Sequence, residues 1–209
     1  MKGTLAACTI SVVVVVVVAV FLFLVPNTFG YLGCHMKVHT LRRGSKNRDT
    51  LRGLLYEVDD ALKSHGIAYW LGEGTCLGAV REQEIIMGDT DVDIGVDVQY
   101  KPLFYDKVLP YLVQRGFRLG RGSRDDNHSI TTIFKNDEYV DIDFTGDVHK
   151  CYALEMGGGS CQKIMNVLGP FQKANIGTRS FTVPSVKYLE LLYGDDWRVP
   201  KRNFKPWHA

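Results

Sequence analysis

Apolar residues at helical spacing mark the start of the segment that can form a folded domain. Between residues 47 and 65 they recur three or four positions apart, which places them on one face of a helix. These positions are Leu51, Leu54, Leu55, Val58 and Leu62. Gly66 follows, and glycine commonly ends a helix. The pattern predicts an amphipathic helix over Asn47–His65 and then a short buried strand over Ile67–Leu71.

Alternation of apolar residues predicts strands farther along the chain. Ile94, Val96 and Val98 alternate with other side chains, as on a half-buried strand. Two β-rich runs, Ser129–Phe134 and Tyr139–Phe144, are joined by a Lys-Asn-Asp-Glu sequence. This composition is typical of a turn, so the two runs predict an antiparallel hairpin.

Glycine and proline divide the segments between these elements. Three glycines surround a short helix predicted over Thr75–Arg81. A helix predicted over Pro102–Gln114 should bend near Pro110, because proline lacks the backbone donor that a helix interior needs. A further strand is predicted over Phe117–Gly120.

The C-terminal part of the chain yields fewer elements. A short strand is predicted over Phe181–Val183, and Ser185 can cap a last helix over Val186–Tyr193 that Gly194 ends. The segment Cys151–Gly177 is glycine-rich and its pattern is hard to interpret, so no element is assigned to it. Helices and strands in this order, together with the hairpin, predict an α+β fold with a mixed sheet.

An uncharged, almost wholly apolar stretch occupies Thr4–Val25 near the N-terminus. At about 1.5 Å per residue it reaches roughly 33 Å as a helix, enough to cross a hydrocarbon core of about 30 Å. The stretch is longer than the apolar region of a cleaved signal peptide, which is the alternative. We therefore expect a signal anchor over residues 1–25, a stem over 26–46 and a catalytic domain over 47–209. Lysines and arginines on the two sides do not fix the orientation of the anchor.

Charge and cysteine content narrow the classes of partner. The 209 residues carry a formal net charge of +2 with no strongly basic face, which argues against a nucleic-acid polymer as partner. The five cysteines include no C-x-x-C pair, so a zinc site is not indicated. In a lumenal domain Cys151 and Cys161 could close a small loop, and Asn127 could carry a glycan.

The candidate chemistry is a run of aspartates. Asp89, Asp91 and Asp93 occupy alternate positions, and Asp141 follows later in a Val-Asp-Ile sequence. On a strand Asp91 and Asp93 would share one face, about 6.5 Å apart. A cation such as Mg²⁺, which prefers oxygen ligands and enters with a substrate phosphate, would offset their repulsion.

A solvated loop and a calcium-binding loop are the alternatives to a strand for this acidic run. An isolated D-x-D sequence is often a solvated loop, but the apolar residues on both sides of this one favour a strand. An EF-hand loop starting at Asp89 would need glycine at its sixth position and glutamate at its twelfth. The sequence has Ile94 and Tyr100 there, which excludes a calcium loop of that type.

Four sequence motifs in order resemble those of the LicD family. Tyr69–Arg81 is similar to the family's W-x-x-x-G-[TS]-x-L-G-A-x-R segment, and Asp89–Asp93 to its W-D-x-D-x-D, with Gly88 in place of the tryptophan. Val140-Asp141-Ile142 and Tyr193–Pro200 are similar to a later acidic motif and to a closing Y-G-x-x-W-x-x-P signature. The resemblance covers most of the chain from Leu51 to Pro200. It implies a minimal nucleotidyltransferase fold of the DNA polymerase β type.

The same resemblance implies an activity. LicD-like proteins transfer a phosphorylated alcohol, such as ribitol phosphate or phosphocholine, from a CDP-activated donor to a glycan or glycoprotein hydroxyl. Asp91, Asp93 and Asp141 are then the expected catalytic residues. Asp91 and Asp93 would hold Mg²⁺ or Mn²⁺, and Asp89 would complete or orient that set of ligands. Asp141 would either hold a second metal ion or accept the proton of the attacking hydroxyl.

Donor-phosphate contacts are expected from the glycine turn and the short helix. Gly74 and Thr75 would offer a backbone N–H and a hydroxyl, and Arg81 a guanidinium that binds phosphate bidentately. An ion pair of Arg81 with a neighbouring glutamate is the structural alternative. Asp143 and Trp70 are weaker candidates for the site.

Three functions remain open from the sequence. The preferred one is a single-pass, type II membrane protein with a lumenal catalytic domain in the Golgi apparatus or endoplasmic reticulum, acting as a LicD-like phosphotransferase. The alternatives are a Golgi D-x-D glycosyltransferase and a catalytically silent LicD-like scaffold.

Overall fold

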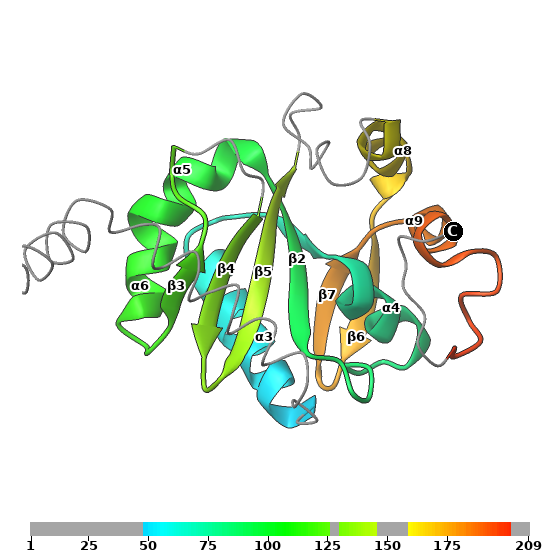
Figure 1. Ribbon diagram of the computed structural model, residues 1–209, viewed down its shortest axis with the longest axis horizontal. Helices are drawn as coiled ribbons and strands as arrows, with labels where there is room; N and C mark the ends of the chain where they lie inside the picture. The colour runs from blue at the N-terminus through cyan, green and yellow to red at the C-terminus, as the bar shows by residue number, and fades with distance from the viewer. Residues whose placement is uncertain (1–47, 126–129, 146–158, 202–209) are drawn as a thin grey trace, which may run out of the picture. The chain divides into compact units, whose positions relative to one another are not determined.

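A computed structural model describes residues 48–125, 130–145 and 159–201 (Figure 1), all within one compact unit, Leu41–Ala209. The helices are α3 (Arg48–Ser64), α4 (Glu73–Arg81), α5 (Lys101–Leu103), α6 (Leu109–Val113), α8 (Gly159–Leu168) and α9 (Val186–Tyr193), with a 3-10 turn η1 (Val98–Tyr100) and a π-helical segment η2 (Phe104–Val108). The strands are β1 (Tyr69–Leu71), β2 (Asp91–Asp97), β3 (Arg118–Arg121), β4 (Ile130–Lys135), β5 (Glu138–Thr145), β6 (Gln172–Ile176) and β7 (Arg179–Val183).

The predicted anchor and stem lie outside these residues. Within the described ranges, no helix is both long and apolar enough to cross a membrane. Cys151 and Asn127 are outside them as well, so the predicted loop closure and glycosylation stay predictions.

Five strands form a mixed sheet in the order β1-β2-β5-β4-β3, and β6 and β7 form a separate two-stranded hairpin. Strands β2 and β5 run parallel, and the other pairs in the large sheet are antiparallel. The chain between β2 and β5 includes α5, α6, β3 and β4. The α+β class with a mixed sheet is therefore confirmed.

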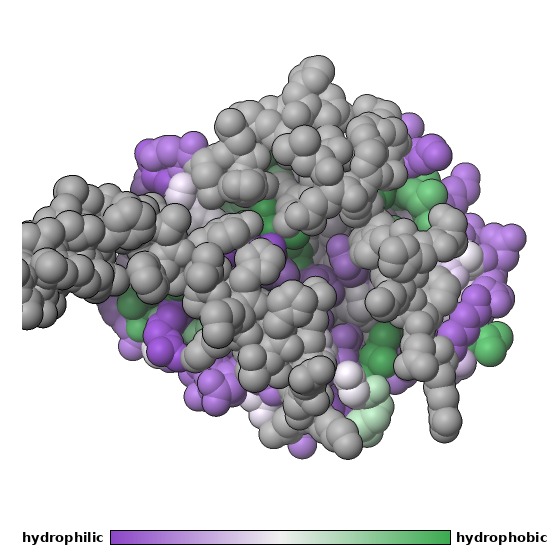
Figure 2. All heavy atoms as spheres, viewed as in Figure 1, coloured by the Kyte–Doolittle hydropathy of each residue, from purple (hydrophilic) through white to green (hydrophobic). Residues whose placement is uncertain are grey.

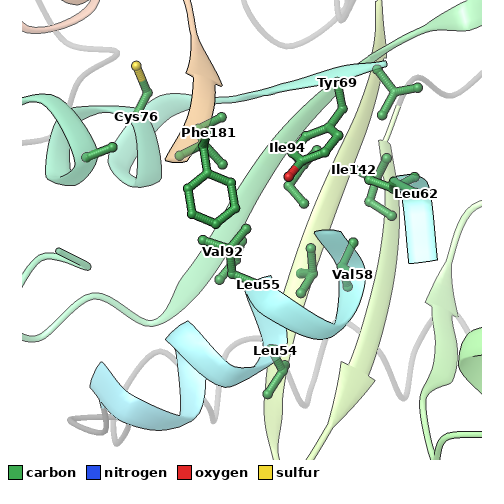
Figure 3. Close-up of a cluster of buried hydrophobic side chains, with 14 of the residues drawn as sticks. Leu54, Leu55, Val58, Leu62, Tyr69, Cys76, Val92, Ile94, Ile142 and Phe181 are labelled. Carbon is green, nitrogen blue, oxygen red and sulfur yellow. The ribbon is translucent and has the colours of Figure 1, made fainter. Parts of the chain in front are cut away.

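One face of the large sheet is apolar and packs on α3, which lies behind the strands in Figure 1. Strand residues Val92, Ile94 and Ile142 are almost fully buried. Figure 3 shows them close to Leu55 and Val58 of α3. Since side chains alternate along a strand, the residues between these apolar positions point to the other face. That second face carries the aspartates.

The sequence located most of these elements within a few residues. Helix α3 and the hairpin of β4 and β5 have nearly the predicted bounds. The hairpin turns through Asn136 and Asp137, both at positive φ, as a two-residue β-turn of the mirror-image type requires. Helix α4 begins two residues earlier than predicted.

The predicted bend near Pro110 is a widened helical turn. Segment η2 is π-helical, and the backbone N–H of Leu109 donates to the carbonyl of Phe104, five residues back. Pro110 has no N–H to give to the carbonyl of Asp106 four residues back, so the regular ladder cannot continue through this point. The irregular turn therefore comes just before the proline.

The structure defines one C-terminal segment that the sequence left unassigned and corrects one C-terminal prediction. The segment Cys151–Gly177, for which no element was predicted, contains α8 and β6, and β6 pairs with β7. Ser185 sits at the N-cap position of α9 but makes no side-chain cap, because its hydroxyl donates to the carbonyl of Val167. This hydrogen bond joins the start of α9 to α8.

Two helical glycines provide a matched test of the packing. A Cβ on Gly78 of α4 would lie 2.5 Å from the carbonyl oxygen of Glu84, whereas one on Gly53 of α3 would meet nothing within 4 Å. Gly78→Ala should lower the free energy of unfolding by about 1–3 kcal/mol. Gly53→Ala should raise it by about 0.5–1 kcal/mol, because alanine costs less entropy in a helix. Urea unfolding of the full chain measures both. Equal stability of the two variants would contradict the close approach of the chain at Glu84 to Gly78 of α4.

Candidate active site

Three aspartate carboxylates meet where β2 lies beside β5. Asp93 pairs directly with Asp141 across the parallel strands, and Asp91 is two residues earlier on the same face. One oxygen from each of Asp91, Asp93 and Asp141 lies within 4.8 Å of the others. The two motifs, separated by almost fifty residues of sequence, are thus one cluster, which we call the acidic triad.

Hydrogen bonds orient two members of the triad. The hydroxyl of Tyr139 donates to Oδ2 of Asp91 at 2.7 Å. Thr132 donates its hydroxyl to Oδ1 of Asp141, and Nη2 of Arg121 lies 3.4 Å from Oδ2 of the same residue. Thr132 is opposite Asp141 in the β4–β5 hairpin. The register of the predicted hairpin was the signal that could have identified it.

The glycine turn before α4 holds Asp93 through its backbone. The N–H of Gly72 donates to the carbonyl of Asp93 at 2.9 Å, and the N–H of Asp93 donates to Oγ1 of Thr75 at 2.8 Å. Thr75 is fully buried. The structure thus gives its hydroxyl a positional role, and the phosphate contact predicted for it stays a prediction.

Asp89 lies against the N-terminus of α4 rather than within the triad. A Cβ on Gly74 would come within 3.0 Å of Oδ2 of Asp89, so the glycine allows this close approach. Oδ1 of Asp89 accepts from the N–H of Thr90. Burial and the charge of Asp91 raise the pKa of Asp89 to about 7.

Glu73 is a site residue that sequence reasoning missed. It is the first residue of α4, with φ of 34°, a left-handed conformation that is uncommon outside glycine. Its N–H donates to the buried hydroxyl of Tyr188 at 3.0 Å. Burial and the charges of Asp143, Asp91, Asp141 and Asp89 raise the pKa of Glu73 to about 8. Its position between the two turn glycines was the available sequence signal.

Arg81 forms an ion pair with a neighbouring glutamate, which was the alternative to a phosphate contact. Its Nη2 lies 2.7 Å from Oε1 of Glu82, and Nη1 donates to the carbonyl of Trp197 at 3.3 Å. The guanidinium therefore joins α4 to the segment after α9. A phosphate contact of Arg81 stays a prediction, whereas Arg121 is the arginine that the structure places beside the triad.

The weaker candidates lie farther along the acidic face. Asp143 pairs with Gly95, two residues beyond Asp93. The indole of Trp70 covers that glycine, where a Cβ would come within 2.2 Å of the ring. Gly88, which stands in place of the family's tryptophan, has φ of +88°, a conformation that a tryptophan rarely adopts.

The triad fits a divalent cation. Three carboxylates offer hard oxygen ligands from two adjacent strands, the donor set that Mg²⁺ and Mn²⁺ prefer. Burial and the charge of Asp91 also hold the pKa of Asp93 well above its ordinary value. Excess negative charge is thus concentrated at one place, and a bound cation would neutralise it. Figure 2, viewed from the same side as Figure 1, shows hydrophilic residues along much of the visible rim of the described part, with hydrophobic patches between them.

Comparison with known proteins gives one family match. The family model described as LicD/FKTN/FKRP, nucleotidyltransferase domain, matches residues 66–186. This range contains the glycine turn, the triad and the β4–β5 hairpin.

Individual relatives cover the chain to different extents. The mouse ribitol-5-phosphate transferase FKTN is 31% identical over 167 residues, which are 75% of this chain and 35% of that protein. An uncharacterized protein of Rickettsia typhi is 35% identical over 83 residues, 40% of this chain and 26% of its own. The chain thus spans about a third or less of these relatives. The solution structure of the antibiotic-resistance factor ANT(2'')-Ia has a TM-score of 0.49 at 17% identity, covering 78% of this chain and 80% of its own.

The crowded acids predict how stability depends on pH without metal. The pKa values of Glu73 and Asp89 are raised from 4.5 and 3.8 to about 8 and about 7, so folding favours their protonated forms. Their contribution to stability is complete below about pH 4 and is lost as pH rises through about 7 and then about 8. The Tm of the full chain in EDTA should fall over this window.

A matched variant and added metal test the cause of this fall. Glu73→Gln should remove part of it, and MgCl₂ or MnCl₂ should offset most of what remains at high pH, because cation binding stabilises the ionised acids. A Tm that is flat across the window, or a fall that Glu73→Gln leaves unchanged, would show that the acids are not crowded in this way.

Proposed function

The chain belongs to the LicD/FKTN/FKRP family of nucleotidyltransferase domains, and on that premise we propose that it transfers a phosphorylated alcohol from a CDP-activated donor to a glycan hydroxyl. The acidic triad is the observation that carries this proposal, because phosphoryl transfer depends on neutralising and positioning phosphate oxygens. The relative FKTN is named as a ribitol-5-phosphate transferase, which favours ribitol phosphate as the group transferred.

The proposed reaction is a single displacement. An acceptor hydroxyl oxygen forms a bond to the phosphorus that bears the alcohol, and the bond from that phosphorus to the CMP oxygen breaks. The hydroxyl loses its proton, which a carboxylate of the site would accept. Mg²⁺ or Mn²⁺ held by Asp91, Asp93 and Asp141 would neutralise the charge on the diphosphate and polarise it for attack.

Asp141 serves as a metal ligand rather than as the proton acceptor in this account. It receives a hydroxyl bond from Thr132 and has the guanidinium of Arg121 beside it. Both contacts hold the carboxylate oxygens in place beside the two other acids of the triad, where a metal ligand is needed.

Arg121 is the proposed contact for the donor diphosphate. Its side chain is a quarter exposed, so an approaching phosphate can reach it. Arginine forms short, paired bonds with phosphate oxygens and keeps its charge in any environment. The N-terminus of α4, at Gly74, would add a backbone donor from the opposite side.

The broader parts of the proposal concern fold type and cellular location. The parallel pairing of an aspartate-rich strand with a strand that carries a third aspartate supports a minimal fold of the DNA polymerase β type. Residues 1–25 are proposed as a signal anchor and 26–46 as a stem. The protein would then be a single-pass, type II membrane protein with its catalytic domain in the lumen of the Golgi apparatus or endoplasmic reticulum.

Release of CMP tests the proposed reaction. The full chain with Mn²⁺ is given CDP-ribitol, CDP-choline or CDP-glycerol separately, with and without glycan acceptors. Acceptor-dependent CMP from one donor is expected, and Asp93→Asn should abolish it, because one triad carboxylate is lost. Release of UDP or GDP from sugar nucleotides instead would favour the glycosyltransferase, and no release from any donor would favour the silent scaffold.

Two arginine variants test which side chain binds the donor phosphate: Arg121, proposed from the structure, or Arg81, predicted from the sequence. Arg121→Gln should lower kcat/KM for the donor by about 10²-fold, because it removes one charged donor at the developing charge. Arg81→Gln should act mainly through stability, since Arg81 pairs with Glu82 and Trp197. The assay is CMP release at equal folded fraction. The reverse order of effects would contradict the assignment of Arg121.

A further inference from the structure

An open groove adjoins the acidic face at the far end of β2. It has a volume of about 390 Å³ and lies where β1, η1 and the β6–β7 hairpin come together. Its lining mixes aromatic and polar side chains, among them Trp70, Tyr100, Phe171, Asp97, Gln99 and Lys63. We call it the aromatic groove.

Trp70 connects the groove to the triad. Its indole covers Gly95, between Asp93 and Asp97 on one face of β2. Asp97 is four residue steps beyond Asp93 along the strand, a distance of about 13 Å. A ligand seated in the groove could therefore extend one end over Trp70 toward the triad.

Aromatic rings in the groove remain accessible. Phe171 is 47% exposed, although its ring packs on Trp70 with ring centroids 5.4 Å apart. The two rings are tilted by 38° and contact each other, so no parallel slot for a flat base remains between them. Their outer faces suit a puckered ring with apolar C–H edges.

Charge in the groove disfavours a phosphate-bearing ligand. Asp97 is an acceptor, and its carboxylate already receives the N–H of Gln99. The ammonium of Lys63 lies 2.7 Å from the buried Asp59, which offsets its charge. A neutral, hydroxyl-rich molecule fits these groups best, because hydroxyls can donate to Asp97 and exchange bonds with the amide of Gln99.

From these observations we propose that the aromatic groove binds a neutral sugar residue of the acceptor glycan. This assignment rests on the proposed function for its place in the reaction, because the sugar would orient an acceptor hydroxyl toward the triad. The binding itself needs neither donor nor metal. The two ideas can therefore fail separately.

Measuring the binding of oligosaccharides directly tests the proposal without any need for catalysis. The full chain is titrated calorimetrically with maltohexaose, N-acetylchitotetraose and mannopentaose, in the absence of any donor. At least one should bind, and Phe171→Ala should weaken it by about tenfold through loss of the stacking surface. Gln99→Ala should weaken it too. Gln99→Ala keeps the hydrogen bond from the backbone N–H of residue 99 to Asp97, so it should leave the local fold intact. Weaker binding by this second variant would show that the loss in Phe171→Ala does not come from misfolding.

Controls separate the groove from the triad and from other exposed residues. Val113→Ala removes a similarly exposed apolar side chain on α6 and should bind the oligosaccharide like the wild type. Asp93→Asn should bind it as well, although it lacks activity. CMP with Mn²⁺ should bind equally to the wild type and to Phe171→Ala.

Three results would overturn the proposal. The first is that none of the three oligosaccharides binds. The second is that the wild type and Phe171→Ala bind an oligosaccharide equally well. The third is that Phe171→Ala loses CMP binding, which would assign the groove to the cytosine of the donor. Phe171-dependent sugar binding in a chain that releases CMP from no donor would leave the groove standing and refute the proposed reaction.

Discussion

The pairing of β2 with β5 is the constraint on which the rest of the site depends. Parallel alignment sets Asp93 opposite Asp141, and alternation places Asp91 on the same face. Negative charges forced together in this way oppose folding unless something compensates them. The burial of Val92, Ile94 and Ile142 on the opposite face holds the register, because a shift by one residue would turn these side chains away from α3.

The surrounding elements hold the acids in place and bring positive charge close to them. Gly72, before α4, donates its N–H to the carbonyl of Asp93, and Thr75, in the first turn of α4, accepts from the N–H of Asp93. The N-terminus of α4, the positive end of its dipole, lies against Asp89. Arg121 approaches from β3, on the far side of Asp141. The arrangement is held tightly by backbone contacts, yet its electrostatics are incomplete without a cation. This combination is what a phosphoryl-transfer site needs.

Much of this could be predicted from the sequence, for identifiable reasons. The leucines of α3 and the alternation of β4 and β5 are strong local patterns, and the resemblance to the LicD family implied that Asp141 belongs with Asp91 and Asp93. Glu73, Arg121 and Thr132 were missed because their roles come from register and packing, which one sequence does not display. The hairpin of β6 and β7 was missed because Gln172–Ile176 is mostly polar and exposed. Arg81 has the ion pair with Glu82 that was the alternative to a phosphate contact, and its contact with the donor phosphate stays a prediction.

Binding of Mn²⁺ to the triad tests the central claim most directly. Electron paramagnetic resonance of the full chain titrated with Mn²⁺, without nucleotide, reports the affinity of the site alone. Asp141→Asn, a change on β5, should weaken binding at least about tenfold, as should Asp93→Asn on β2. Asp106→Asn, which makes the same change in net charge at the exposed partner of Arg124, should bind like the wild type. Wild-type affinity in Asp141→Asn would show that the two strands do not form one metal site.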